Sequence, residues 1–135
     1  MHGDSMEQEL INQLLALPGE TIHLEKGEFL FHEGDIADHF FIVREGRLSI
    51  KKFEASGHIF AHRLVGPNNV LGEIPLYETN TRTYVFNAIA REKCSVYSIR
   101  YDVLEPAIAK DHSLAIAMMK IYTLHMRRQQ AKYRD

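Results

Sequence analysis

The 135-residue chain has a single cysteine, Cys94, and no long apolar run. One thiol cannot close a disulfide within the chain or supply a cluster of thiolate metal ligands. Chains without disulfides are typical of a reducing compartment. No stretch approaches 18 consecutive apolar residues, and no cationic segment precedes an apolar run at the N-terminus, so neither a membrane span nor a secretory signal is expected. We therefore expect a cytoplasmic protein without membrane contact.

The chain also lacks a strong charge of either sign. It has 16 Lys and Arg residues against 18 Asp and Glu residues, a formal net charge of −2. A balance this close to neutral gives no general attraction to nucleic acid. Its length and 45% hydrophobic content suit one domain with a buried core, and the chain is too short for two ordinary domains.

The apolar pattern divides the chain into three parts. Residues 5–17 show a helical apolar stripe after a Ser5–Gln8 capping-box spacing. From residue 21 to residue 100, short β-prone segments alternate with turn residues every 8–12 positions, which is typical of an antiparallel sandwich or barrel. The expected strands are 21–24, 29–32, 39–44, 48–53, 59–64, 70–71, 83–90 and 95–100. We predict a β-roll or jelly roll over 21–100.

After residue 100 the helical period returns, and we predict two C-terminal helices within 101–133. Pro106 is expected to break or kink the first helix, and Asp111 or Ser113 to cap the second. The apolar sector of the long helix is too broad for one contact face. We therefore predict a homodimer through this helix, and a single domain made of helix 5–17, the β-roll and these helices.

One short segment carries the chemistry of a binding site. Gly72-Glu73 opens a turn, and Arg82-Thr83 closes it nine positions after Glu73. Glycine lets a ligand approach the backbone closely. The Glu73 carboxylate can accept a hydrogen bond from a sugar hydroxyl, and the Arg82 guanidinium offers a planar fork of donors for phosphate. Thr83 adds a hydroxyl and a backbone N–H beside the arginine. Together these groups suit a ribose phosphate.

Residues 71–88, which read LGEIPLYETNTRTYVFNA, resemble the phosphate-binding cassette of cyclic-nucleotide-binding domains. The segments 26–35, 39–48, 64–73 and 88–96 resemble other blocks of that family in the same order, so the likeness covers nearly the whole chain. A β-roll followed by a long helix is similar to the sensor half of Crp/Fnr-type bacterial transcription regulators, where that helix dimerises.

The resemblance implies a non-enzymatic sensor that requires no cofactor or metal. Its effector would be a cyclic nucleotide, cAMP or cGMP, or another small anion. The ligand-binding residues it implies are Gly72, Glu73, Ile74, Arg82 and Thr83, joined from the C-terminal helix by Tyr122, Thr123 and Arg127. A helix-turn-helix domain follows the long helix in those regulators, but this chain ends at Asp135. We therefore expect DNA contact only through a domain outside the chain, and a stand-alone sensor is the alternative.

Two residues depart from the family pattern. Pro75 replaces an alanine or glycine whose backbone N–H faces the phosphate, and proline has no such donor. Tyr84 replaces a small residue two places after the arginine. These departures keep open a second interpretation, a degenerate dimerisation module without ligand. A third, a cupin-like metal enzyme, has little support: His58 and His62 would lie roughly 13 Å apart along a strand, at about 3.3 Å per residue, too far for one metal.

Overall fold

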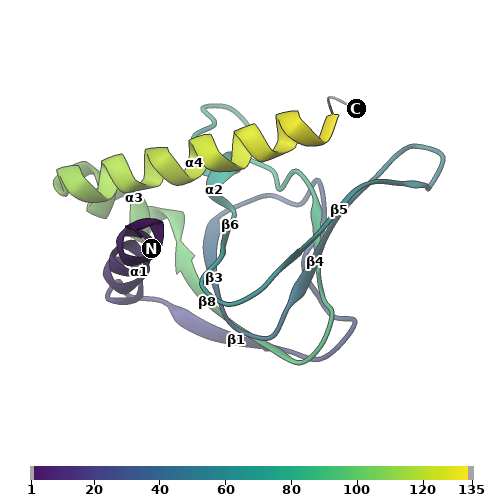
Figure 1. Cartoon of the computed structure of the whole chain (residues 1–135), viewed down its shortest axis with the longest axis horizontal. Helices are drawn as coiled ribbons and strands as arrows, with labels where there is room; N and C mark the ends of the chain where they lie inside the picture. Colours follow the sequence, from purple (N-terminus) through teal and green to yellow (C-terminus); the bar gives the residue numbers. More distant parts are fainter. Residues whose placement is uncertain (1, 134–135) are drawn as a thin grey trace.

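A computed structural model describes residues 2–133, including the side chains of residues 8–59, 62–124 and 126–127. Three longer helices flank eight strands, and one short helix interrupts them (Figure 1). The elements in chain order are α1 (His2–Leu15), β1 (Glu20–Leu24), β2 (Phe29–Phe31), β3 (His39–Glu45), β4 (Leu48–Phe53), β5 (Ile59–Val65), β6 (Val70–Leu71), α2 (Glu73–Leu76), β7 (Asn87–Ala90), β8 (Cys94–Arg100), α3 (Tyr101–Lys110) and α4 (His112–Tyr133).

The strands form two antiparallel sheets of four, in the orders β1-β8-β3-β6 and β2-β7-β4-β5. Buried residues fill the space between the sheets, among them Val43, Leu48 and Ala88, each fully buried. The predicted fold class, antiparallel β-roll with flanking helices, is confirmed. Seven of the eight expected strands lie within one residue of their observed ends.

The segment expected as a strand over 83–90 is a strand only from Asn87 onward. Its first half is extended, but it pairs with the loop between β2 and β3 instead of with a strand. The Tyr84 N–H donates to the Asp35 carbonyl at 3.0 Å, and the Tyr84 carbonyl accepts from the Gly34 N–H at 2.8 Å. This pairing fixes the residues that follow Arg82.

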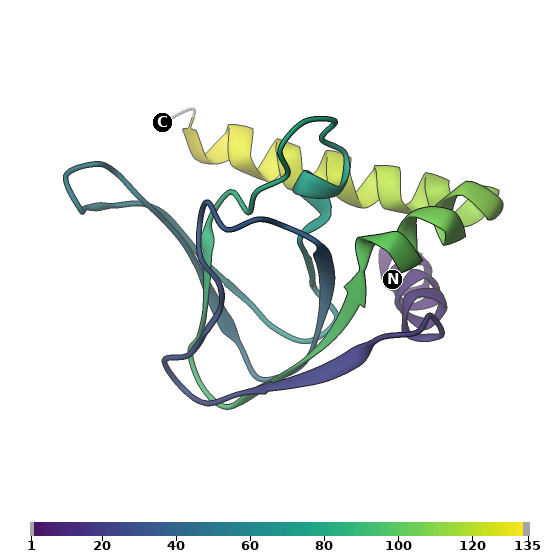
Figure 2. The same ribbon diagram turned by 180° about the vertical axis from the view of Figure 1, so that it is seen from behind.

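Helices α1, α3 and α4 gather at one end of the roll, with α4 lying across it (Figures 1 and 2). Beneath them, Phe40 of β3 and Ile99 of β8 are cross-strand partners and fully buried. α1 begins at His2 and ends at Leu15, a little earlier at both ends than the pattern predicts. α3 continues through Pro106 without a break.

The cap of α4 is the aspartate. Asp111 Oδ1 accepts a hydrogen bond from the Leu114 N–H at 3.2 Å and another from the Ser113 hydroxyl at 2.9 Å. These bonds lower the pKa of the Asp111 carboxyl. Because the cap follows directly after α3, it fixes the turn from which α4 crosses the roll.

Candidate functional site

The site begins at Gly72, which follows β6 and caps α2 with a φ of 87°. A side chain is excluded there, since a Cβ would lie 2.8 Å from the carbonyl oxygen of His39 and the φ is in the left-handed region. The tight turn places Glu73 at the first position of α2, where it is only 2% exposed. The predicted turn at Gly72-Glu73 is thus a one-turn helix with a buried carboxylate.

Two tyrosines surround the Glu73 carboxylate. Burial first, and the negative charge of Glu73 second, raise the pKa of Tyr77 to about 12. The pKa of Tyr101 is also raised, by burial and by the nearby Tyr84 and Glu73. The Tyr101 hydroxyl donates a hydrogen bond to the Gly72 carbonyl. Since Tyr101 is the first residue of α3, this bond ties the start of that helix to the loop.

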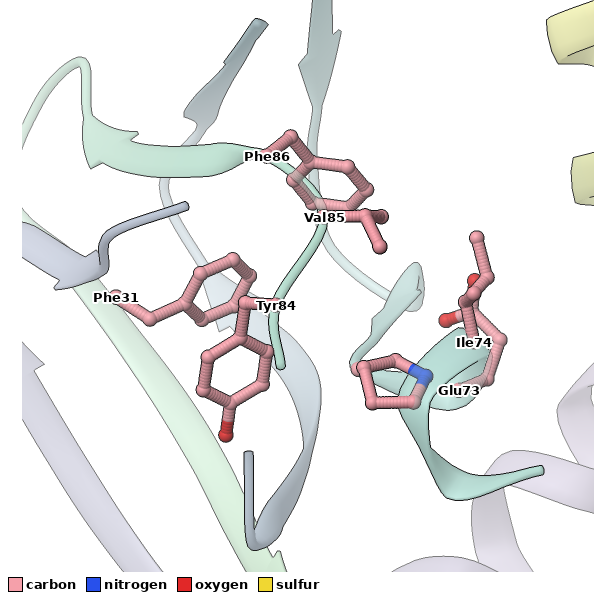
Figure 3. Close-up of a pocket in the computed structure, with 8 residues that line it drawn as sticks. Phe31, Glu73, Ile74, Tyr84, Val85 and Phe86 are labelled. Carbon is pink, nitrogen blue, oxygen red and sulfur yellow. The ribbon is translucent and has the colours of Figure 1, made fainter. Parts of the chain in front are cut away.

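A narrow hollow lies between α2 and the segment that leads into β7 (Figure 3). Although the space between its atoms totals about 190 Å³, no water-sized sphere fits in it. The lining residues are Phe31, Gly72, Glu73, Ile74, Pro75, Tyr84, Val85 and Phe86. Three of the predicted ligand-binding residues, Gly72, Glu73 and Ile74, therefore share one wall, whereas Arg82 and Thr83 are not among the residues that line it.

Tyr84 closes this hollow from the side of the roll. Its ring stacks on Phe31 with the centroids 4.0 Å apart and the planes 13° apart. Figure 3 shows the two rings together, facing the wall of α2. The Tyr84 hydroxyl donates to the His39 carbonyl at 3.1 Å and accepts from the His39 N–H at 3.3 Å. Burial raises the pKa of Tyr84 to about 12. The bulky departure from the family pattern is an inward-facing, hydrogen-bonded part of the core.

Arg82 is directed to α3. Its Nη1 and Nη2 atoms donate to the two carboxylate oxygens of Glu105, each at 3.1 Å, and its Nε donates to the Glu78 carbonyl at 3.2 Å. The guanidinium carbon lies 5.4 Å from the ring centroid of Tyr101. The hydrogen bonds to Glu105 raise the pKa of Arg82, so the guanidinium stays cationic. Glu73 and Arg82 thus both lie next to Tyr101, but only Glu73 lines the hollow.

Of the three residues predicted on the long helix, Tyr122 reaches the loop. Its ring meets Tyr77 edge-on, with centroids 4.9 Å apart and planes 73° apart. Thr123 and Arg127 are exposed. The helix therefore approaches the site through one aromatic contact.

The sequence reasoning did not single out Tyr101 and Glu105. A signal for them exists, because the two residues are four positions apart on the predicted helix 101–110 and therefore share one helix face. The sequence pattern does not show, however, that this face of α3 contacts Arg82.

Among the described residues, His, Cys, Asp and Glu side chains form no group of three or more that could hold a metal ion. Among the same residues, no helix is long and apolar enough to cross a bilayer.

The β-roll, the short helix after Gly72 and the arginine loop together define a cyclic-nucleotide-binding-like sensor domain. Residues 21–111 match the cyclic nucleotide-binding domain family, and the chain belongs to it.

Curated relatives include the anaerobic regulatory protein of Bacillus subtilis, 29% identical over 112 residues, which are 83% of this chain and 47% of the relative. Another is the CRP-like cAMP-activated global transcriptional regulator of Mycobacterium tuberculosis, 21% identical over 81% of this chain and 48% of the relative. The chain therefore spans about half the length of these regulators. They confirm the predicted resemblance to Crp/Fnr-type sensor domains.

Solved structures show the same fold. A transcriptional regulator from Thermotoga maritima matches with a TM-score of 0.78 at 24% identity, over 90% of this chain and 93% of that one. The sensor domain of the transcriptional regulator DNR from Pseudomonas aeruginosa matches with a TM-score of 0.74 at 18% identity, over 100% of this chain and 98% of that one. These likenesses place the predicted β-roll and its long helix in a known architecture.

Proposed function

We propose that this domain binds a small anionic effector of the cyclic nucleotide type through Gly72, Glu73, Ile74, Arg82 and Thr83. The observation that carries the proposal is the bidentate pairing of Arg82 with Glu105. A carboxylate in the fork of a guanidinium occupies the position that a phosphate would take, since both anions suit the same planar pair of donors. Glu105 is in this sense an internal substitute for the ligand's anion.

Effector binding then exchanges one anion for another on Arg82. The arginine leaves Glu105, so the loop loses its ion pair with α3. Tyr84 has to move as well, because its ring lines the hollow beside Glu73 and closes it from the side of the roll. A ligand shifts a conformational equilibrium only through different contacts in the two states. The exchange at Glu105 is such a difference, and it acts on α3, which continues into α4.

We propose further that α4 joins two copies of the chain and carries the change to a DNA-binding domain outside this chain. The exposed apolar residues of α4 support this, namely Ile116, Met119 and Leu124. Replacing Ile116 and Met119 by glutamate should convert a dimer into a monomer in analytical ultracentrifugation. A wild-type chain that sediments as a monomer at high micromolar concentration would contradict the dimer.

Calorimetric titration of cAMP and cGMP tests the effector site. We expect saturable binding of one of the two nucleotides, abolished by Arg82→Ala and unchanged by Arg91→Ala, an exposed arginine in the turn before β8. Glu105→Gln removes the competing carboxylate and should tighten binding by up to about fivefold, the equivalent of an ion pair of about 1 kcal/mol. Absence of binding to both the wild type and Glu105→Gln would overturn cyclic nucleotide recognition.

The narrowness of the same hollow favours a second candidate function, that of a dimerisation module without ligand. A domain that only holds a dimer together needs no ligand space, and both Tyr84 and Pro75 reduce what is available. The variant Tyr84→Ala separates the two functions, because it opens the hollow. If Tyr84→Ala folds, dimerises and still binds neither nucleotide, the ligand-free dimerisation module is the better description.

A further inference from the structure

A second, more open hollow lies at the end of the sheet β1-β8-β3. Its volume is about 290 Å³, at the small end of the range of about 300–1,000 Å³ that is typical of ligand pockets. Polar side chains line it together with two apolar ones: Glu20, His39, Ser98 and Arg100, with Pro18 and Val103. None of these six is a residue of the cassette loop. We call this hollow the Arg100 groove.

The strand register places the four polar residues on one face of the sheet. Glu20 is opposite Ser98, and His39 is opposite Arg100. Ser98 and Arg100 are two positions apart on β8, so their side chains point the same way. Diagonal neighbours across antiparallel strands are about 7–8 Å apart. Glu20 and Arg100 are such diagonal neighbours, so one small molecule can reach both side chains.

The wall on the side of β1 is held firmly. The Tyr97 hydroxyl donates to the Leu17 carbonyl at 2.6 Å and so fastens the end of α1 to β8. Gly19 packs so tightly that a Cβ there would lie 2.5 Å from the Ser98 carbonyl oxygen. A groove with fixed walls loses little conformational entropy when it binds a ligand.

Arg100 and His39 are both oriented by carboxylates outside the lining of the groove. Arg100 donates from Nε and Nη2 to Asp102, at 3.0 and 2.8 Å, which leaves the Nη1 donors for another acceptor. These bonds raise the pKa of Arg100, so it stays charged. The His39 Nδ1 atom lies 2.6 Å from Asp38 Oδ1, which fixes the ring and leaves Nε2 for a ligand.

The charges of the side chains at the groove indicate which class of ligand it can bind. Glu20, Asp38 and Asp102 outnumber Arg100, so a simple anion gains little here. A simple cation would be repelled by the Arg100 guanidinium, which lines the same groove. A zwitterion meets both conditions, because its ammonium can bind Glu20 while its carboxylate accepts from Arg100 and His39.

We infer that the Arg100 groove binds a free α-amino acid with an apolar side chain. The carboxylate lies on Arg100 and His39, the ammonium on Glu20, and the side chain against Pro18 and Val103. A groove of about 290 Å³ has room for one such molecule. No residue that lines this site belongs to the cassette loop, and the inference does not rest on the proposed function.

Calorimetric titration of the whole chain with L-valine, L-leucine, L-methionine and L-phenylalanine tests the inference. We expect saturable binding of at least one of them with one site per chain. The amine that lacks the carboxylate of the best ligand, and the acid that lacks its ammonium, should each bind at least tenfold more weakly. For leucine these two analogues are 3-methylbutylamine and 4-methylpentanoate.

Glu20→Gln and Arg100→Gln should each weaken binding at least tenfold, whereas the matched changes Glu54→Gln and Arg91→Gln should alter it less than twofold. Arg82→Ala should leave amino-acid binding intact, so failure of the nucleotide site and failure of this one are distinguishable. Absence of binding by all four amino acids would overturn the inference. Equal binding of either single-charge analogue to the wild-type chain would also overturn it, whatever the folding of the variants.

Discussion

The two hollows of this domain differ in how open they are. The one beside Glu73 belongs to the segment that resembles the family's ligand-binding loop, yet Tyr84 closes it and Glu105 pairs with the arginine of that segment. The Arg100 groove has no counterpart in that resemblance and is open. Closure by the chain's own groups would make ligand binding at the first hollow depend on rearrangement, whereas the second needs none. Resemblance therefore predicts where a ligand site would lie, and the individual side chains determine whether that place is ready to bind.

His39 connects the two hollows. Its backbone N–H and carbonyl bond the Tyr84 hydroxyl, and the same residue lines the Arg100 groove. Gly72 also packs against the His39 carbonyl. Substitutions of Tyr84 or Gly72 should therefore destabilise the closed hollow strongly. The size of the loss measures how firmly the His39 backbone is held.

The largest effect is expected from Tyr84→Ala. Removing a buried aromatic ring should lower the free energy of unfolding by about 3–5 kcal/mol, because the Phe31 stacking is lost and a cavity remains. Urea unfolding followed by circular dichroism measures this. Tyr84→Phe keeps the ring and should cost only about 1 kcal/mol for the hydroxyl bonds to His39. Equal losses for the two variants would mean that the ring does not carry the packing.

A smaller loss is expected from Gly72→Ala. Its φ of 87° strains any residue with a Cβ, and this Cβ would also press on the His39 carbonyl at 2.8 Å. Gly34→Ala is the matched control, since its φ of 90° carries the same strain while no atom lies within 4 Å of the added Cβ. The free energy of unfolding should fall by about 1–2 kcal/mol in Gly34→Ala and by clearly more in Gly72→Ala. Thermal unfolding of both variants compares them, and indistinguishable midpoints would refute the close approach.

High pH should destabilise the domain through Tyr84. Burial raises its pKa from the ordinary 10 to about 12, so the folded chain keeps this proton at a pH where the unfolded chain has lost it. The stabilisation is complete below pH 10 and is lost as the pH rises through 12. Two pKa units correspond to roughly 2–3 kcal/mol. This loss exceeds the advantage of about 1 kcal/mol that wild type has over Tyr84→Phe. The difference in their free energies of unfolding should therefore shrink and then change sign as the pH rises in urea titrations, and a constant difference would contradict a buried phenol.

Much of this architecture could be predicted, because alternating apolar residues and glycine turns specify strands locally. The prediction of a strand over residues 83–90 was wrong for its first four residues, and the reason is physical. Tyr84 is β-prone, but its backbone pairs with Asp35 and Gly34, which a one-dimensional pattern cannot reveal. The sequence predicts Gly72, Glu73, Arg82 and Thr83 as ligand contacts from their types and spacing. It does not predict that Arg82 turns to α3 instead of lining the hollow, because that depends on Glu105, whose contact with Arg82 spans 23 positions of the chain.

The smallest effect concerns that ion pair. Arg82 and Glu105 side chains are 28% and 47% exposed, so solvent screens their attraction. A double-mutant cycle with Arg82→Gln and Glu105→Gln should give a coupling free energy of about 0.5–1 kcal/mol, decreasing as salt is added. So weak a pair is easily exchanged for a ligand anion, which is what a closed but functional site requires. A coupling well above this range would instead make Arg82 a structural residue and leave only the Arg100 groove open to ligands.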